Sequence, residues 1–222
     1  MRSALVALAL ALAACGAPTQ NTNAPAAPPA PAPASAVAPP SEIAMQPIAD
    51  TKPAPPASSA WKVNAAASTI SFNGKHRTIG PFTGVFKGWS AKIVFDPNDL
   101  AHANVAVTIP TAGVTTGQQI IDEAWPETEW FDVKTYPSAT FAATAFKSLG
   151  PGKYEADGAL TIKGKAYPAA LPFTLVINGA NATAAGALTL DRTKLNIGMQ
   201  SDAAGDWVDK NVTVNIKVVA AK

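Results

Sequence analysis

The feature that most constrains this 222-residue chain is a regular alternation of apolar and polar residues in segments between residues 61 and 222. The segments are 69–73, 92–95, 104–109, 154–163, 171–177 and 211–218, with further candidates at 139–146 and 186–190. Because successive side chains of a strand point to opposite faces, each segment predicts a strand with one buried face. About eight such antiparallel strands predict an all-β fold, in which a barrel or a two-sheet sandwich protects the sheet edges.

One segment departs from this alternation and predicts a short helix over residues 116–125. Thr116 and Gln119 have the spacing of a capping box, and Pro126 is expected to end the helix. Further along the chain, Gly164 and Lys165 predict a tight turn between two of the strands.

Residues 16–60 have a different composition, with 12 of the 20 prolines of the chain. Proline removes a backbone donor, and bulky apolar residues are too few here to offset an ordering cost of about 1–2 kcal/mol per residue. We therefore predict that residues 15–60 hold a lipidated cysteine and a disordered Pro/Ala-rich tether, and that residues 61–222 form the folded domain.

The first fourteen residues have the features of a secretory signal peptide. Arg2 supplies a positive charge, and the apolar run at 3–11 is far shorter than the roughly 20 residues of a spanning helix. Residues 12–15 (LAAC) resemble the bacterial lipobox, whose cysteine carries the lipid. We expect acylation at Cys15, the single cysteine of the chain; the alternative is an ordinary signal peptide with an incidental cysteine.

Such an anchor predicts an exported bacterial lipoprotein. The residue after the lipidated cysteine is Gly16, whereas an Asp at this position commonly retains such proteins at the inner membrane. We therefore expect the protein to be anchored in the outer membrane, with its domain facing the periplasm. Removal of residues 1–14 leaves 16 basic residues against 15 acidic ones, a charge that does not indicate a nucleic-acid partner. Without a second cysteine the mature chain cannot form an internal disulfide.

Several phrases in the second part of the chain occur in the order typical of one known family. The phrases are 61–64 (WKVN), Phe72 with His76, 82–86 (FTGVF), 93–97 (IVFDP), 130–132 (WFD) with 136–141 (YPSATF), and 158–164 (GALTIKG). Together they resemble the YceI-like family, lipocalin-like periplasmic barrels that bind isoprenoid-type lipids. This chain departs from the family at Lys163, where members often have Arg.

The resemblance implies a barrel of about eight strands whose alternate residues face a ligand. The expected pocket residues are Ile70, Phe72, His76, Phe82, Phe86, Ile93, Phe95, Val107, Trp130, Phe131, Phe141, Leu160, Ile162 and Phe173. An apolar lining suits a polyprenyl tail, because burial is worth about 25 cal/mol per Å². The alternative is that these side chains meet each other as a packed core, but the small residues Ala139, Ala156 and Gly158 favour a cavity.

We do not expect the candidate polar groups to form a catalytic or metal site, and an enzyme acting on a lipid or a sugar is the least favoured alternative. Two histidines, His76 and His102, lack a ligand partner at metal-binding spacing, so we expect both to be structural or solvated, although His76 could hydrogen-bond a ligand head group. Five carboxylates lie among three aromatic residues at positions 125, 130 and 131: Asp122, Glu123, Glu127, Glu129 and Asp132. Glycosidases need carboxylates on both sides of a cleft, whereas these lie in one segment.

The sequence therefore predicts a non-enzymatic, lipid-anchored periplasmic protein without cofactor or metal. We expect it to sequester or carry an amphiphilic isoprenoid-type lipid, such as a quinone or a polyprenyl lipid, in an apolar barrel cavity. The alternative is a structural or stress-related interaction module with a packed barrel and no ligand.

Overall fold

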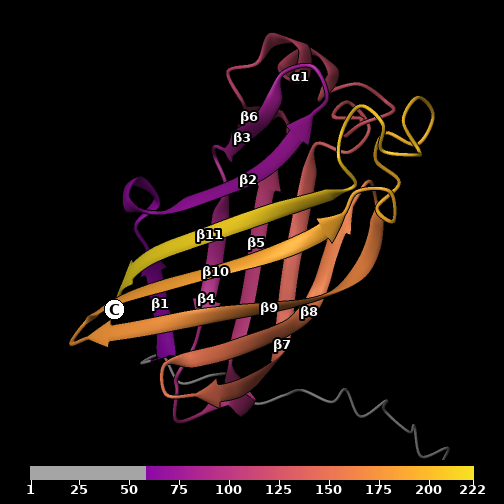
Figure 1. The fold of residues 1–222 in the computed structure, drawn as a ribbon. Helices are drawn as coiled ribbons and strands as arrows, with labels where there is room; N and C mark the ends of the chain where they lie inside the picture. The colour runs from indigo at the N-terminus through magenta and orange to yellow at the C-terminus, as the bar shows by residue number, and fades with distance from the viewer. Residues whose placement is uncertain (1–58) are drawn as a thin grey trace, which may run out of the picture. The chain divides into compact units, whose positions relative to one another are not determined.

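The computed structural model describes residues 59–222, which form antiparallel strands rolled into a barrel (Figure 1). The strands are β1 (Ala60–Val63), β2 (Thr69–His76), β3 (Gly80–Phe86), β4 (Ser90–Val94), β5 (Asn104–Pro110), β6 (Val114–Thr115), β7 (Ser138–Gly150), β8 (Lys153–Ile162), β9 (Lys165–Asn178), β10 (Asn181–Asp191) and β11 (Asn211–Ala221). One α-helix, α1 (Gln119–Ala124), and three short 3-10 turns (Ala65–Ala67, Leu100–His102 and Thr111–Gly113) connect them.

Eight strands close the barrel, in the order β1-β4-β5-β7-β8-β9-β10-β11, because β11 pairs back onto β1. The closing pairs are Lys62 with Ala221 and Val63 with Ala220. Farther along, β11 pairs with β2, which continues through β3 to β6 at the end of the barrel that carries α1 (Figure 1). The prediction of an antiparallel eight-stranded barrel with one short helix is confirmed.

The beginning of the barrel differs slightly from the predicted domain start. β1 begins at Ala60, inside the segment predicted as tether, and the carbonyl of Ser59 accepts a hydrogen bond of 2.8 Å from the backbone N–H of Phe95. The predicted signal peptide, Cys15 and residues 16–58 lie outside the described residues.

The turn between β8 and β9 lies one residue earlier than predicted. It consists of Lys163 (φ +48°) and Gly164 (φ +72°), and both residues have the left-handed conformation that a two-residue hairpin requires. β9 therefore starts at Lys165, well before the predicted start at residue 171.

The predicted capping box of the helix is wrong, and α1 is shorter than expected. The Thr116 hydroxyl donates a 2.7 Å hydrogen bond to the carboxylate of Asp122, while the Gln119 side chain donates to Glu123 at 2.7 Å. Gly117, at φ +70°, turns the chain so that the helix begins only at Gln119. The hydrogen bond from the Thr116 hydroxyl is the main reason that the pKa of Asp122 is lowered.

The end of the barrel opposite α1 is a packed core. Phe95 is 5% exposed, and its ring lies edge-on to the rings of Phe146, Tyr154 and Phe173 at centroid distances of 5.5, 5.2 and 5.8 Å. The indole N–H of Trp61 donates a 2.8 Å hydrogen bond to the carbonyl of Phe95. These contacts form a packed aromatic cluster at this end of the barrel.

Candidate functional site

A cavity of about 500 Å³ occupies the interior of the barrel. Its volume lies within the roughly 300–1,000 Å³ of known ligand pockets. Strands from the whole circumference contribute to it, including β5 through Val107, β8 through Leu160 and β9 through Phe173. Among residues 59–222 no large side chain is completely buried, as expected where lining atoms face an open space.

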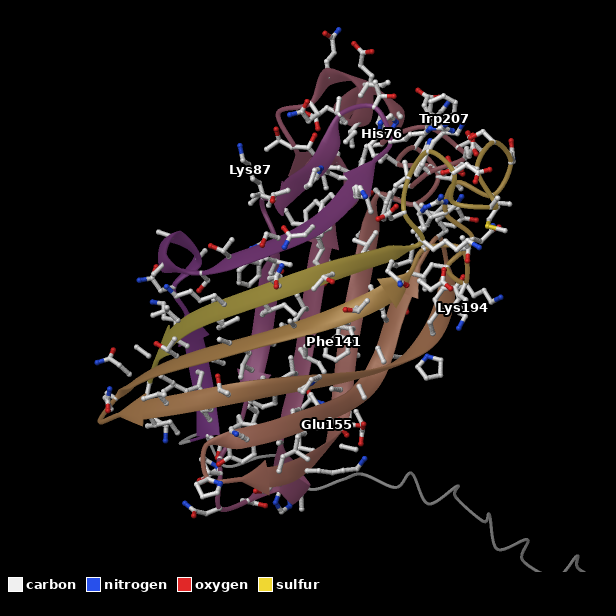
Figure 2. All side chains as sticks on the ribbon, viewed as in Figure 1. His76, Lys87, Phe141, Glu155, Lys194 and Trp207 are labelled. Atoms are coloured by element: carbon white, nitrogen blue, oxygen red, sulfur yellow. The ribbon has the colours of Figure 1, made fainter. Side chains whose placement is uncertain are left out.

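The lining is apolar because the strands alternate. On β5 the residues at 105, 107 and 109 line the cavity, and on β9 the residues at 171, 173 and 175 do so, while their neighbours face outward. This is the period of two that the sequence shows. Phe141 projects from β7 near mid-height in the barrel (Figure 2).

The structure brings together all fourteen residues that the sequence predicted as pocket residues. They border the same cavity, whereas contact of each with a ligand stays a prediction. Two of the three small residues, Ala139 and Ala156, also line it. Gly158 does not add volume, because a Cβ there would collide with the backbone of Ala142 on β7.

Other lining residues escaped the sequence reasoning. Ile120 and Ile121 belong to the short helix, for which no inward face was predicted, and Leu195 and Ile197 lie in the loop after β10, which has no strand or helix pattern. Val214 on β11 could have been found, because its segment alternates clearly.

Aromatic rings form one wall of the cavity next to α1. Trp125 stacks on Phe131 with centroids 3.8 Å apart and on Phe72 at 5.1 Å, and its indole N–H donates to the carbonyl of Thr111 at 2.8 Å. The five carboxylates of this segment are not among the lining residues. Glu129, for example, accepts a 2.6 Å hydrogen bond from the hydroxyl of Ser201, which lowers its pKa.

The cavity opens at this same end of the barrel. Ile120 and Trp207 line it and are nevertheless 55% and 52% exposed, so both stand at the entrance. Trp207 and the half-buried His76 lie near each other there, with ring centroids 6.4 Å apart (Figure 2). The backbone N–H of Thr78 donates to Nδ1 of His76 at 3.2 Å.

A buried ion pair, Arg192 with Asp202, borders the cavity near the entrance. Its Nη2–Oδ2 distance is 2.6 Å, and each side chain is 3% exposed. Nη2 also donates to the carbonyls of Asp202 (2.9 Å) and Val208 (2.6 Å). Nη1 donates to the carbonyl of Ile197 at 2.9 Å, and Nε donates to that of Asp209 at 3.2 Å. The pair thus fixes the loop between β10 and β11.

The sequence reasoning missed this pair, although Arg192 directly follows the last residue of β10. Burial works to raise the pKa of Asp202, but backbone N–H groups of Val208, Trp207 and Asp206 and the charge of Arg192 outweigh it, so the pKa is lowered. The carboxylate therefore stays ionised beside the guanidinium.

Lys163, the residue that departs from the family pattern, points to loops rather than into the cavity. Its ammonium group donates to the carbonyls of Thr128 (2.9 Å), Glu129 (3.3 Å) and Asn196 (3.4 Å). Lys163 therefore joins the two loops that surround the entrance.

The described part of the chain shows no cluster of three or more His, Cys, Asp or Glu residues able to hold a metal ion. His102 pairs with Asp99 at 2.7 Å, far from His76 in the chain and outside the cavity lining. No α-helix within residues 59–222 has the length and apolar character to cross a membrane.

Known proteins similar to this chain share the barrel. The chain is 35% identical to BcnA from Burkholderia cenocepacia, whose crystal structure aligns with a TM-score of 0.68 over 72% of this chain and 100% of BcnA. A polyisoprenoid binding domain from Saccharophagus degradans, implicated in plant cell wall breakdown, has the same fold at 15% identity, with a TM-score of 0.55 over 73% of this chain and 98% of that domain.

Sequence relatives point the same way. A UPF0312 protein of Vibrio cholerae is 25% identical over 67% of this chain and 81% of its own length. Another, of Ectopseudomonas mendocina, is 28% identical over 50% of this chain, and the match spans 58% of that relative. The YceI-like domain matches residues 61–220. With the barrel, the cavity and this match together, the chain belongs to the YceI-like family.

Proposed function

We propose that this protein is a lipid-anchored periplasmic binding protein that holds an amphiphilic isoprenoid-type lipid, such as a quinone or a polyprenyl lipid, in its barrel. The observation that supports this most is the apolar cavity of about 500 Å³, which borders a packed aromatic cluster and has exposed lining residues at the end near α1. An apolar tail can enter such a cavity while its polar head stays at the entrance.

The energy of the cavity favours an apolar occupant. At about 24 cal/mol per Å³, a dry cavity of this size would cost roughly 12 kcal/mol, comparable with the whole stability of a typical domain. Water gains little from apolar walls because they offer it few hydrogen-bond partners. A hydrocarbon tail restores the missing contacts, so ligand binding stabilises the fold.

The cavity also argues against a packed interaction module. In a solid core each inward-facing ring would contact others, as Phe95 and Tyr154 do. Phe141 instead borders the cavity and is half-buried. The fold neighbour from Saccharophagus degradans is described as polyisoprenoid-binding. At 15% identity this likeness supports only the shared fold, so the proposed ligand rests on the cavity.

The segment between the proposed anchor at Cys15 and the barrel is long enough to let the domain reach a ligand in the membrane. Cys15 precedes Ser59 by 44 residues, and such a segment can reach at most about 150 Å at roughly 3.4 Å per residue. That reach exceeds the length of the barrel, because even the 14 residues of β9 span only about 46 Å. A domain on this tether could turn either end toward the membrane.

Lipid extraction and native mass spectrometry of the purified protein test the proposal. We expect a copurifying or added prenyl lipid to be retained by the parent and lost from Phe141→Asp, which places a carboxylate among the lining residues. Val176→Asp is the matched control, since Val176 lies on β9, is 58% exposed and is not a lining residue. A parent that retains neither a cellular lipid nor an added prenyl lipid would refute the proposal.

A further inference from the structure

We infer that the cavity accepts amphiphiles with an uncharged, hydrogen-bonding head and rejects those whose head is a phosphate, pyrophosphate or carboxylate. The inference rests on the proposed function, because it concerns the head of a ligand whose apolar tail fills the barrel. It follows from the hydrogen bonds of Arg192 and Lys163, from the carboxylates of the neighbouring segment and from the position of His76.

Arg192 is the one Lys or Arg among the lining residues of the described chain. All three of its guanidinium nitrogens already donate to protein oxygens, namely Asp202 and the carbonyls of the surrounding loop. A phosphate can bind Arg in a bidentate manner only where N–H groups are free to point at it. At 3% exposure Arg192 has no such face to offer.

The charge of Arg192 is also neutralised where it stands. The Asp202 carboxylate lies 2.6 Å from Nη2 and accepts backbone N–H groups of Asp206 (2.7 Å) and Val208 (2.8 Å). An anionic head approaching the guanidinium would therefore meet an ionised carboxylate at similar distance. Separating the pair would leave a buried charge without a partner, which is strongly unfavourable.

Lys163 does not supply the missing cation. Its ammonium group is directed at three loop carbonyls, and it does not line the cavity. A three-donor ammonium group with three carbonyl partners has no donor left for a ligand. The basic turn of this chain thus holds loops together instead of a head group.

The segment that forms the aromatic wall adds negative charge near the entrance. Residues 116–137 contain five carboxylates and one lysine, Lys134. Arg77, which follows His76 in the chain, lies over the ring of Trp207, with the guanidinium carbon 5.5 Å from the centroid. The excess of carboxylates within this segment disfavours an anionic head and leaves an uncharged head unaffected.

His76 supplies the contact that an uncharged head needs. Because Nδ1 accepts the N–H of Thr78, the neutral ring carries its proton on Nε2 and can donate it. His76 is half-buried and lines the cavity at its entrance, so the partner it suits is a carbonyl, ether or hydroxyl oxygen. The hydroxyls of two other lining residues, Thr111 and Ser201, already have protein partners.

Two ligands that share a tail and differ only in the head test the inference. Geranylgeraniol and geranylgeranyl pyrophosphate can be titrated into the full mature protein at about pH 8, where histidine is ordinarily neutral, with the fluorescence of the lining tryptophans as the signal. We expect the alcohol to bind at least about tenfold more tightly. Equal or tighter binding of the pyrophosphate would overturn the inference while leaving the proposed function in place; if neither ligand bound, the proposed function itself would fail.

A variant that adds a cation at the entrance sharpens the test. His76→Arg should raise the affinity for the pyrophosphate about tenfold and leave the alcohol equal or weaker. His102→Arg is the matched control, because it makes the same change outside the cavity, beside Asp99. A gain of the same size in both variants, or no gain in His76→Arg, would overturn the placement of the head at the entrance.

Discussion

The ring of Phe72 on β2 covers Gly84 on β3, its direct partner across the strands. A Cβ atom at position 84 would collide with this ring. The same arrangement recurs at the next pair, where Phe82 covers Gly74 at the position a Cβ would take. Glycine is needed at both sites because aromatic side chains occupy the space of its missing side chain. These pairs hold the aromatic wall of the cavity against the barrel.

Gly84→Ala should therefore lower the free energy of unfolding by about 1–3 kcal/mol, because the added methyl group forces the Phe72 ring from its position. Urea denaturation measures the loss. In a Phe72→Leu variant the smaller side chain leaves room for the new methyl group. Gly84→Ala should therefore lower the free energy of unfolding clearly less in that variant than in the parent. Equal losses in both backgrounds would contradict the steric explanation.

Phe95 belongs to the packed aromatic cluster and Phe141 lies near mid-height in the barrel, so replacing each should separate the cost of lost packing from the loss of lipid binding. Phe95 contacts three aromatic rings in the packed end, so Phe95→Ala is expected to cost about 3–5 kcal/mol. Phe141 faces the cavity, so Phe141→Ala should cost less than half of that and should mainly weaken lipid retention. Thermal unfolding and bound-lipid mass measure the two effects. Comparable destabilisation by both changes would indicate that Phe141 is also core.

The ion pair of Arg192 and Asp202 predicts a loss of stability in acid. The folded-state pKa of Asp202 is lowered from its ordinary value of 3.8, so its contribution is complete above that value and disappears as the pH falls through the lowered pKa. Asp202→Asn removes this titration. The stability of the variant should be lower at about pH 6 and should fall less between about pH 6 and pH 3 than that of the parent. Urea midpoints across this range provide the measurement, and parallel pH curves would show that Asp202 does not contribute.

The lipid anchor is tested by changing the lipobox. Cys15→Ser should abolish acylation and release the protein into the soluble periplasmic fraction, because the thiol that carries the lipid is gone. Gly16→Asp should keep the lipid but retain the protein at the inner membrane. Cell fractionation with detection of the acylated form checks both. A Cys15→Ser protein that stays in the membrane fraction with unchanged mobility would refute this anchor.

Most of the strand segments could be predicted because their signal is local. The pattern at 104–109 became β5, where the predicted Val107 lines the cavity, and the pattern at 211–218 became most of β11. β1, β3 and β6 were not predicted as strands. β1 and β6 contain only four and two residues, and β3 includes Pro81 and Gly84, which weaken a strand pattern.

The polar part of the site could not be predicted, because its partners lie in loops without periodicity. Arg192 meets Asp202 ten residues later, and most of its other partners are backbone carbonyls, which leave no mark on the sequence. Lys163 reaches carbonyls more than thirty residues away. The helix prediction located α1 correctly but missed its start, since Thr116 binds Asp122 instead of capping the helix.

The sequence by itself determined that residues from Trp61 onward form antiparallel strands with an apolar inner face, because the direction of each side chain follows from its parity in the strand. Only the tertiary structure decided that this face surrounds a cavity, and that the cavity borders a packed aromatic cluster at the end opposite α1. Whether a barrel is hollow depends on the difference between the space its strands enclose and the summed volume of the side chains inside. That difference belongs to the closed barrel as a whole, and no single segment of the sequence contains it.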